Sequence, residues 1–150
     1  MSKIWLVFVF ISISIIGKTQ NLTVYRSEKS VIETVEAITT EITQREELIF
    51  FETVSHDEIA KERGLKLAPT KSILFEDPAL TTILINCQQT AALDLPLEIL
   101  VWEESGDVYI GFIDPKYMVR RFMIDGCDDT IQQLSALLIR VSVGALKNLH

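Results

Sequence analysis

The sequence predicts an α+β fold, in which helices pack on a mixed or antiparallel sheet of about five strands. Three observations support this fold class. Short segments are rich in β-branched and aromatic residues, helical patterns of apolar residues lie between them, and 48% of the 150 residues are apolar. The elements come in the order strand, helix, strand, helix, strand, helix, strand, strand, helix, helix, with no repeat or linker between them. We therefore expect a single compact domain.

The first residues of the chain form a segment distinct from this domain. Lys3 carries a positive charge, and an unbroken run of apolar residues and serines follows over residues 4–16. This run is shorter than the stretch of about 20 residues that crosses a bilayer as a helix. Its length and flanking charge are typical of a secretory signal peptide, and Gly17 and Thr19 supply the small residues needed before a cut at Gln20.

We therefore expect a signal peptide over residues 1–19 and the domain over residues 20–150, exported to the periplasm or the extracellular space. An N-terminal anchor that is not cleaved is the alternative. Cleavage leaves 12 basic and 21 acidic residues, so the net charge changes from −7 to −9. This balance argues against nucleic acid, and against an anionic membrane after cleavage, because both are bound through Lys and Arg.

The first half of the domain begins with a strand and a helix. Residues 21–27 alternate between apolar and polar side chains, which predicts a strand. Ser30 and Glu33 have the spacing of a capping box, and apolar residues at helical spacing then predict a helix over 31–44. Residues 48–54 are rich in β-branched and aromatic residues and predict a second strand.

A second capping box is expected next, formed by Ser55 and Glu58, and Gly64 suits the end of the short helix that it starts. Residues 72–75 predict a third strand. A helix over 78–88 follows, with proline at its first position.

The second half of the domain is expected to contain a hairpin and two helices. The segments 97–102 and 108–113 are apolar on both faces, which predicts central strands, and Gly106 suits the turn between them. One or two helical turns are expected over 116–122. A long helix is predicted over 129–149.

Two histidines give little support for a metal site, because a protein metal site needs three or four converging ligands. His150 is the last residue of the chain, and no His-x-x-His or Cys-x-x-Cys pair exists. The glycines are scattered, so no phosphate-binding loop is recognisable. We expect neither a metal nor a cofactor.

His56, Asp77, Asp94 and Asp114 are the candidate ligand-binding residues. His56 lies at the start of a predicted helix, so it is either part of a structural helix start or a ligand-facing side chain. Asp77 and Asp114 precede prolines, and Asp94 comes two residues before one, positions at which a turn or cap role is the ordinary explanation. No nucleophile and base are recognisable as a pair, and we assign no catalytic residue.

Cys87 and Cys127 have 39 residues between them. In an oxidising compartment an even pair of cysteines is consistent with a disulfide. The alternative is a pair of unbridged thiols, one inside a helix and one in a loop after Gly126.

Four segments are notable together, namely Gly64 to Thr70, Phe75 to Pro78, Leu93 to Pro96, and Asp114-Pro115. In combination they resemble the domain of unknown function 302 family, whose usual strings read Gly-Leu-x-Leu-x-Pro-Thr, Phe-Gly-Asn-Pro and Leu-Asp-Leu-Pro. The resemblance covers about residues 28–122. It implies a compact α+β fold, as in the bacterial and archaeal members of the family, and it assigns neither an activity nor a catalytic residue to this chain. Glu76-Asp77 departs from the family's Gly-Asn, so any site lined by that turn is altered here.

Two functions are consistent with these patterns. The first is an exported, non-catalytic module that binds an unknown small molecule or protein, or forms a homodimer, through an apolar pocket or face ringed by the loops at Asp77, Asp94 and Asp114. The second is a small hydrolase-like enzyme that uses His56 with a neighbouring carboxylate. A catalytic His56 requires a cleft and a polar partner within hydrogen-bond reach.

Overall fold

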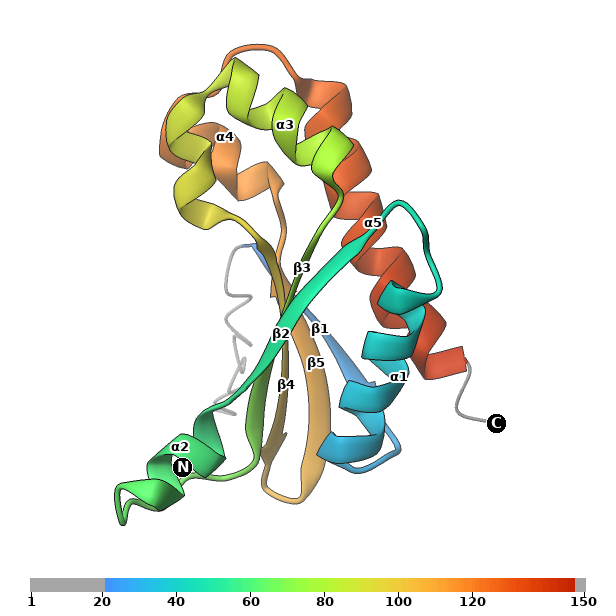
Figure 1. Ribbon diagram of the computed structural model, residues 1–150, viewed down its shortest axis with the longest axis vertical. Helices are drawn as coiled ribbons and strands as arrows, with labels where there is room; N and C mark the ends of the chain where they lie inside the picture. Colours follow the sequence, from blue (N-terminus) through green and yellow to red (C-terminus); the bar gives the residue numbers. More distant parts are fainter. Residues whose placement is uncertain (1–20, 148–150) are drawn as a thin grey trace, which may run out of the picture.

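The computed structural model describes residues 21–147 and shows the expected α+β architecture, one five-stranded antiparallel sheet with helices packed on it (Figure 1). The elements are β1 (Leu22–Ser27), α1 (Val31–Thr43), β2 (Ile49–Ser55), α2 (His56–Glu62), β3 (Thr70–Glu76), α3 (Pro78–Cys87), the 3₁₀ helix η1 (Gln89–Asp94), β4 (Leu97–Glu104), β5 (Asp107–Ile113), α4 (Lys116–Phe122) and α5 (Asp128–Lys147). Only η1 was not expected. The predicted signal peptide lies outside the described residues.

The sheet has the strand order β1-β5-β4-β3-β2, and every neighbouring pair is antiparallel. The expected hairpin pairs β4 with β5 through a two-residue turn, in which Ser105 and Gly106 both have positive φ. These two strands lie away from the edges of the sheet, as their apolar sequences predict. β1 and β2 form the edges.

The helices α1 and α5 pack side by side on one face of the sheet (Figure 1). Their apolar stripes meet the inward side chains of the central strands. Fully buried side chains of this core include Ile38, Ile73, Ile99, Ile110, Leu134 and Leu138. Burial of apolar side chains on this scale is the main stabilising contribution to such a domain.

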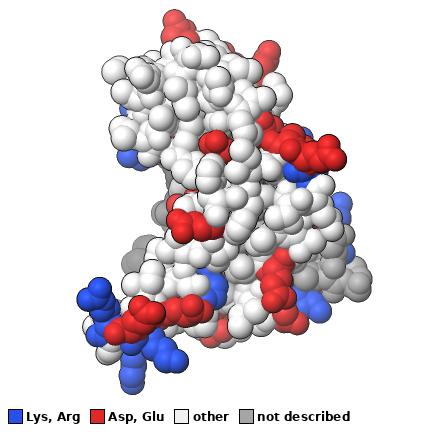
Figure 2. Space-filling model, viewed as in Figure 1, with Lys and Arg blue, Asp and Glu red and all other residues white. Residues whose placement is uncertain are grey.

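The remaining helices lie beyond the two ends of the sheet. α3, η1 and α4 form a lobe at one end, and α2 lies at the other end (Figure 1). Charged side chains gather over α2, and a waist separates that end of the molecule from the lobe (Figure 2). Within residues 21–147, no helix is long and apolar enough to cross a membrane.

Two of the helix starts follow the sequence and one does not. Ser30 and Glu33 form the expected capping box, and the hydrogen bonds from Ser30 lower the pKa of the Glu33 carboxyl. Asp77 caps α3, with Pro78 in its first turn. The second expected capping box is wrong, because the side chain of Ser55 makes no cap hydrogen bond.

Contacts with Lys71 explain why Ser55 and Glu58 do not form the capping box. Its ammonium group donates to Ser55 Oγ at 2.9 Å and to Glu58 Oε1 at 2.8 Å, so both capping side chains are used elsewhere. Burial alone would lower the pKa of Lys71, but the hydrogen bond to Glu58 and the charges of Asp57 and Glu58 raise it above its usual value.

Candidate functional site

The face of the sheet opposite α1 and α5 carries at least one apolar side chain on each of its five strands, namely Val24, Ile113, Leu100, Leu74 and Val54. One row crosses all five strands in register, formed by Val54, Ser72, Leu100, Gly111 and Val24. A sheet face open to water normally carries polar side chains.

Several of the apolar side chains on this face are exposed to solvent. Leu22 is 40% exposed, Val24 is 42% exposed and Ile113 is 54% exposed, and these residues lie on the paired strands β1 and β5. Leu22 is the cross-strand partner of Ile113. Exposed apolar side chains that lie next to one another are typical of a surface that binds a ligand or another protein.

At one end of this face the structure forms a hollow of about 810 Å³. The sheet is its floor, and η1 and α4 form its walls. The apolar lining includes Leu22, Leu74, Leu93, Leu95, Leu100, Ile113, Tyr117 and Met118. Small-molecule sites have volumes of about 300–1,000 Å³ and a mainly apolar lining, so this hollow has the size and character of one.

Four charged residues also line the hollow, namely Asp94, Glu98, Asp114 and Arg121. Asp94 lies 3.4 Å from the Arg121 guanidinium and forms an ion pair with it. The ends of β4 and β5 and the end of η1 meet here, which brings Asp94 and Asp114 into one site. The sequence analysis proposed that the loops at Asp77, Asp94 and Asp114 ring one pocket, and the structure brings Asp94 and Asp114 together but leaves Asp77 outside.

Asp114 has a structural role as well as a place in the lining. Its Oδ1 atom accepts a hydrogen bond from the Ser135 hydroxyl at 2.6 Å and another from the Lys116 backbone N–H at 3.0 Å. These contacts tie the start of α4 to α5.

Asp77 lies outside this hollow. Its carboxylate accepts hydrogen bonds from the backbone N–H groups of Ala79 and Leu80, at 3.0 and 3.2 Å, as an N-cap does. It borders a separate hollow of about 660 Å³ that is lined on its other side by α5.

His56, the first residue of α2, is exposed at the end of the sheet opposite the lobe of α3, η1 and α4. Its Nε2 atom lies 3.1 Å from Ser72 Oγ, and the Ser72 hydroxyl donates to Glu98 Oε1 at 2.5 Å. A serine hydroxyl has a single proton. Because that proton goes to Glu98, His56 is the donor to Ser72.

The order histidine, serine, carboxylate therefore differs from a hydrolytic triad, in which the histidine accepts the serine proton and the carboxylate holds the histidine. Ser72 is also only 3% exposed. Sequence reasoning missed Ser72 and Glu98, because their proximity to His56 depends on the register of β3 and β4.

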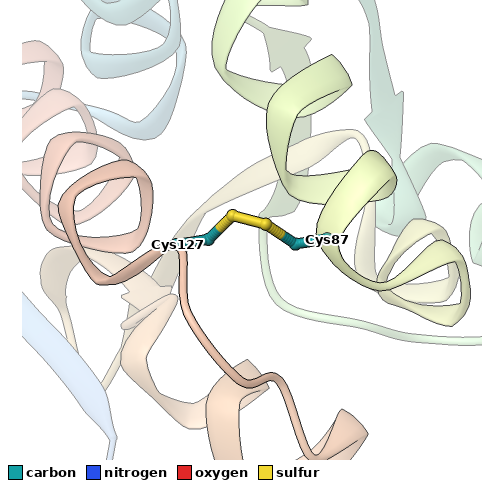
Figure 3. The surroundings of a disulfide bond; sticks show 2 residues. All are labelled: Cys87 and Cys127. Atoms are coloured by element: carbon teal, nitrogen blue, oxygen red, sulfur yellow. A yellow bond between two sulfur atoms is a disulfide. The ribbon is translucent and has the colours of Figure 1, made fainter.

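Cys87, the last residue of α3, is joined by a disulfide to Cys127, in the loop before α5 (Figure 3). Their Cα atoms are 6.6 Å apart, within the usual range for a disulfide. The bond ties the lobe of α3 to α5. Among residues 21–147, no group of three or more His, Cys, Asp or Glu side chains is arranged to hold a metal ion.

Comparison with known proteins places this fold in a family. The profile of the family described as "Domain of unknown function DUF302" matches residues 23–141. The chain belongs to this family. The resemblance seen in the sequence motifs is confirmed, and the match extends beyond residues 28–122 at both ends.

The DUF302 chain also resembles part of several longer proteins. It is 37% identical over 101 residues to "Fluoride-specific ion channel FluC 1" of Brucella suis, and equally to a protein of the same name in Brucella abortus. These matches cover 67% of this chain and 39% and 37% of those two proteins. The chain thus spans about two fifths of the length of the curated relatives that it matches.

A solved structure confirms the fold of this DUF302 chain. The uncharacterized conserved protein DUF302 from Bacillus stearothermophilus superposes with a TM-score of 0.70 at 19% identity. The superposition covers 87% of this chain and 99% of that one.

Proposed function

We propose that this DUF302 domain is a non-catalytic binding module that takes a small, largely apolar molecule into the hollow between the sheet, η1 and α4. The hollow is the observation that supports this proposal. It has the volume of a small-molecule site, and apolar side chains from both sheet and helices line it.

The curated relatives are consistent with a module of this kind. In proteins named as fluoride-specific ion channels, a segment similar to this chain makes up about two fifths of the length. A binding domain attached to a further domain is a common arrangement, and the name of the whole protein belongs to those longer chains.

We also propose that the domain works outside the cytoplasm after cleavage before Gln20. The N-terminal sequence has the features of a signal peptide, and the paired cysteines suit an oxidising compartment.

A neutral dye that fluoresces only in apolar surroundings, N-phenyl-1-naphthylamine, tests the binding function. We expect saturable binding to the chain from Gln20 onward. Leu93→Lys is expected to weaken it, because Leu93 lines the hollow and is 78% exposed, so that the substitution leaves the fold intact.

Leu65→Lys is the matched control, since Leu65 is 66% exposed and lies outside the lining of the hollow. Equal dye binding by Leu93→Lys, Leu65→Lys and the unchanged protein would contradict the proposal, and so would the absence of saturable binding.

A hydrolase-like enzyme remains the second candidate, because His56 lies within hydrogen-bond reach of Ser72. If this function holds, the chain cleaves p-nitrophenyl acetate faster than an equimolar mixture of imidazole and carboxylate does, and both His56→Ala and Ser72→Ala abolish the excess. No excess is expected if the domain only binds, because the Ser72 proton goes to Glu98.

A further inference from the structure

We infer that the hollow binds an amphiphilic cation, an amine with an apolar body whose ammonium group pairs with Glu98. This inference rests on the binding function proposed above, and it adds the charge of the ligand.

The described part of the lining of the hollow has more negatively charged side chains than positively charged ones. Among residues 21–147, the lining has three carboxylates, those of Asp94, Glu98 and Asp114, and a single guanidinium, that of Arg121. Arg121 already forms an ion pair with Asp94. This described part of the lining therefore keeps two negative charges that Arg121 does not neutralise.

Of these two carboxylates, Glu98 has the fewer partners. Asp114 accepts from Ser135 and from the start of α4. Within residues 21–147, Glu98 accepts one side-chain hydrogen bond, from the neutral Ser72, and forms no ion pair. His56 lies on the other side of Ser72 and contacts that hydroxyl.

The position of Glu98 defines the shape of the ligand. Leu74 is its cross-strand partner on β3, and Leu100 is the next residue of β4 on the same face. The carboxylate thus stands among apolar side chains, and Ser72 fixes its orientation. A ligand that matches this surface combines an apolar body with a cationic donor, whereas an anionic amphiphile meets uncompensated negative charge.

Calorimetric titration with three compounds of equal chain length tests the inference: dodecylammonium chloride, dodecanol and sodium dodecanoate, each below the concentration at which it aggregates. The protein is the disulfide-bonded chain from Gln20 onward at pH 7. We expect dodecylammonium to bind more tightly than dodecanol, and dodecanoate to bind most weakly.

Glu98→Gln is expected to weaken dodecylammonium binding about fivefold, the size of a partly exposed ion pair, and to leave dodecanol binding unchanged. The glutamine carbonyl can still accept from Ser72, so the fold is preserved. Glu103→Gln is the matched control, because it removes the same charge from the same strand outside the hollow.

Tighter binding of dodecanoate than of dodecylammonium overturns the inference, as does an equal effect of Glu98→Gln and Glu103→Gln, while the proposed binding function stands. Failure of all three compounds to bind overturns both.

Discussion

The indole ring of Trp102 lies directly over Gly111, across the β4–β5 pair. A Cβ atom added at Gly111 would lie 2.9 Å from Cζ3 and 3.1 Å from Cη2 of that ring. The indole also stacks on Tyr109, with ring centroids 5.4 Å apart. The absence of a side chain at Gly111 therefore gives the aromatic pair its place on the sheet face.

Gly111→Ala is expected to lower the free energy of unfolding by about 2 kcal/mol, the typical cost of overpacking beside a rigid ring. In the chain from Gln20 onward Trp102 is the sole tryptophan, so its emission spectrum should shift as the ring moves. Urea unfolding followed by fluorescence measures both effects.

A second substitution checks the cause. Trp102→Leu removes the ring, so Gly111→Ala should cost less in that background than in the unchanged protein. Because no tryptophan then remains in the chain from Gln20 onward, urea unfolding of all four proteins is followed by circular dichroism. Equal costs in the two backgrounds would show that the indole is not the reason for the glycine.

Patterns confined to neighbouring residues predicted this structure well. The capping box of Ser30 and Glu33 and the Asp77 cap with Pro78 use residues within a few positions of one another, and both are present. The predicted capping box of Ser55 and Glu58 is absent, because Lys71, sixteen positions after Ser55, binds both of these side chains. A sequence pattern does not reveal such a competitor.

The candidate site could also be predicted only in part, because contacts between residues distant in the sequence form it. Asp94 and Asp114 stood out because each lies near a proline, and both line the hollow. Ser72 and Glu98 carry no local signal. They meet because Leu74 pairs with Glu98, which is a matter of strand register and not of composition.

Because Lys71 forms ion pairs with Asp57 and Glu58, we expect the protein to lose stability at alkaline pH. The folded-state pKa of Lys71 lies above the value of 10.5 of the free side chain, so its stabilising contribution is complete below pH 10.5 and is lost as the pH rises through the folded pKa. We expect Lys71→Met to lower the free energy of unfolding by about 1 kcal/mol at pH 7, since its partner Glu58 is largely exposed.

The difference between Lys71→Met and the unchanged protein should be constant from pH 7 to pH 9, and it should shrink above pH 10.5. Lys61→Met, which removes a lysine from the same end of the molecule, is the control. A difference that grows with pH would contradict the assignment of Lys71 as a charged, stabilising partner.

The disulfide between Cys87 and Cys127 should stabilise the fold by limiting the unfolded chain. On the chain-entropy model, a loop of about 40 residues corresponds to about 4 kcal/mol. Reduction, or Cys127→Ser, is therefore expected to lower the melting temperature by many degrees with little change in the circular dichroism spectrum of the folded protein.

A thiol count on the denatured, unreduced protein is the direct check. Material from an oxidising compartment should have no free thiol, and the chain from Gln20 onward made in a reducing cytoplasm should have two. Two free thiols in the exported material, together with a melting temperature indifferent to a reductant, would exclude the bond.

We expect cleavage before Gln20 to depend on the small residues at positions 17 and 19. Gly17 and Thr19 are small enough for signal peptidase, whereas a bulky residue at position 19 is not, so Thr19→Trp should leave a longer chain attached to the membrane. Production of the full chain in a bacterial host, followed by intact-mass analysis of the exported fraction, should give a protein that begins at Gln20, with or without cyclisation to pyroglutamate. Thr23→Trp is the matched control, since it lies beyond the cut and should leave the new N-terminus unchanged. A membrane-bound protein that retains Lys3 without any substitution would establish the anchor instead, and the domain would then act at the membrane surface and not free in solution.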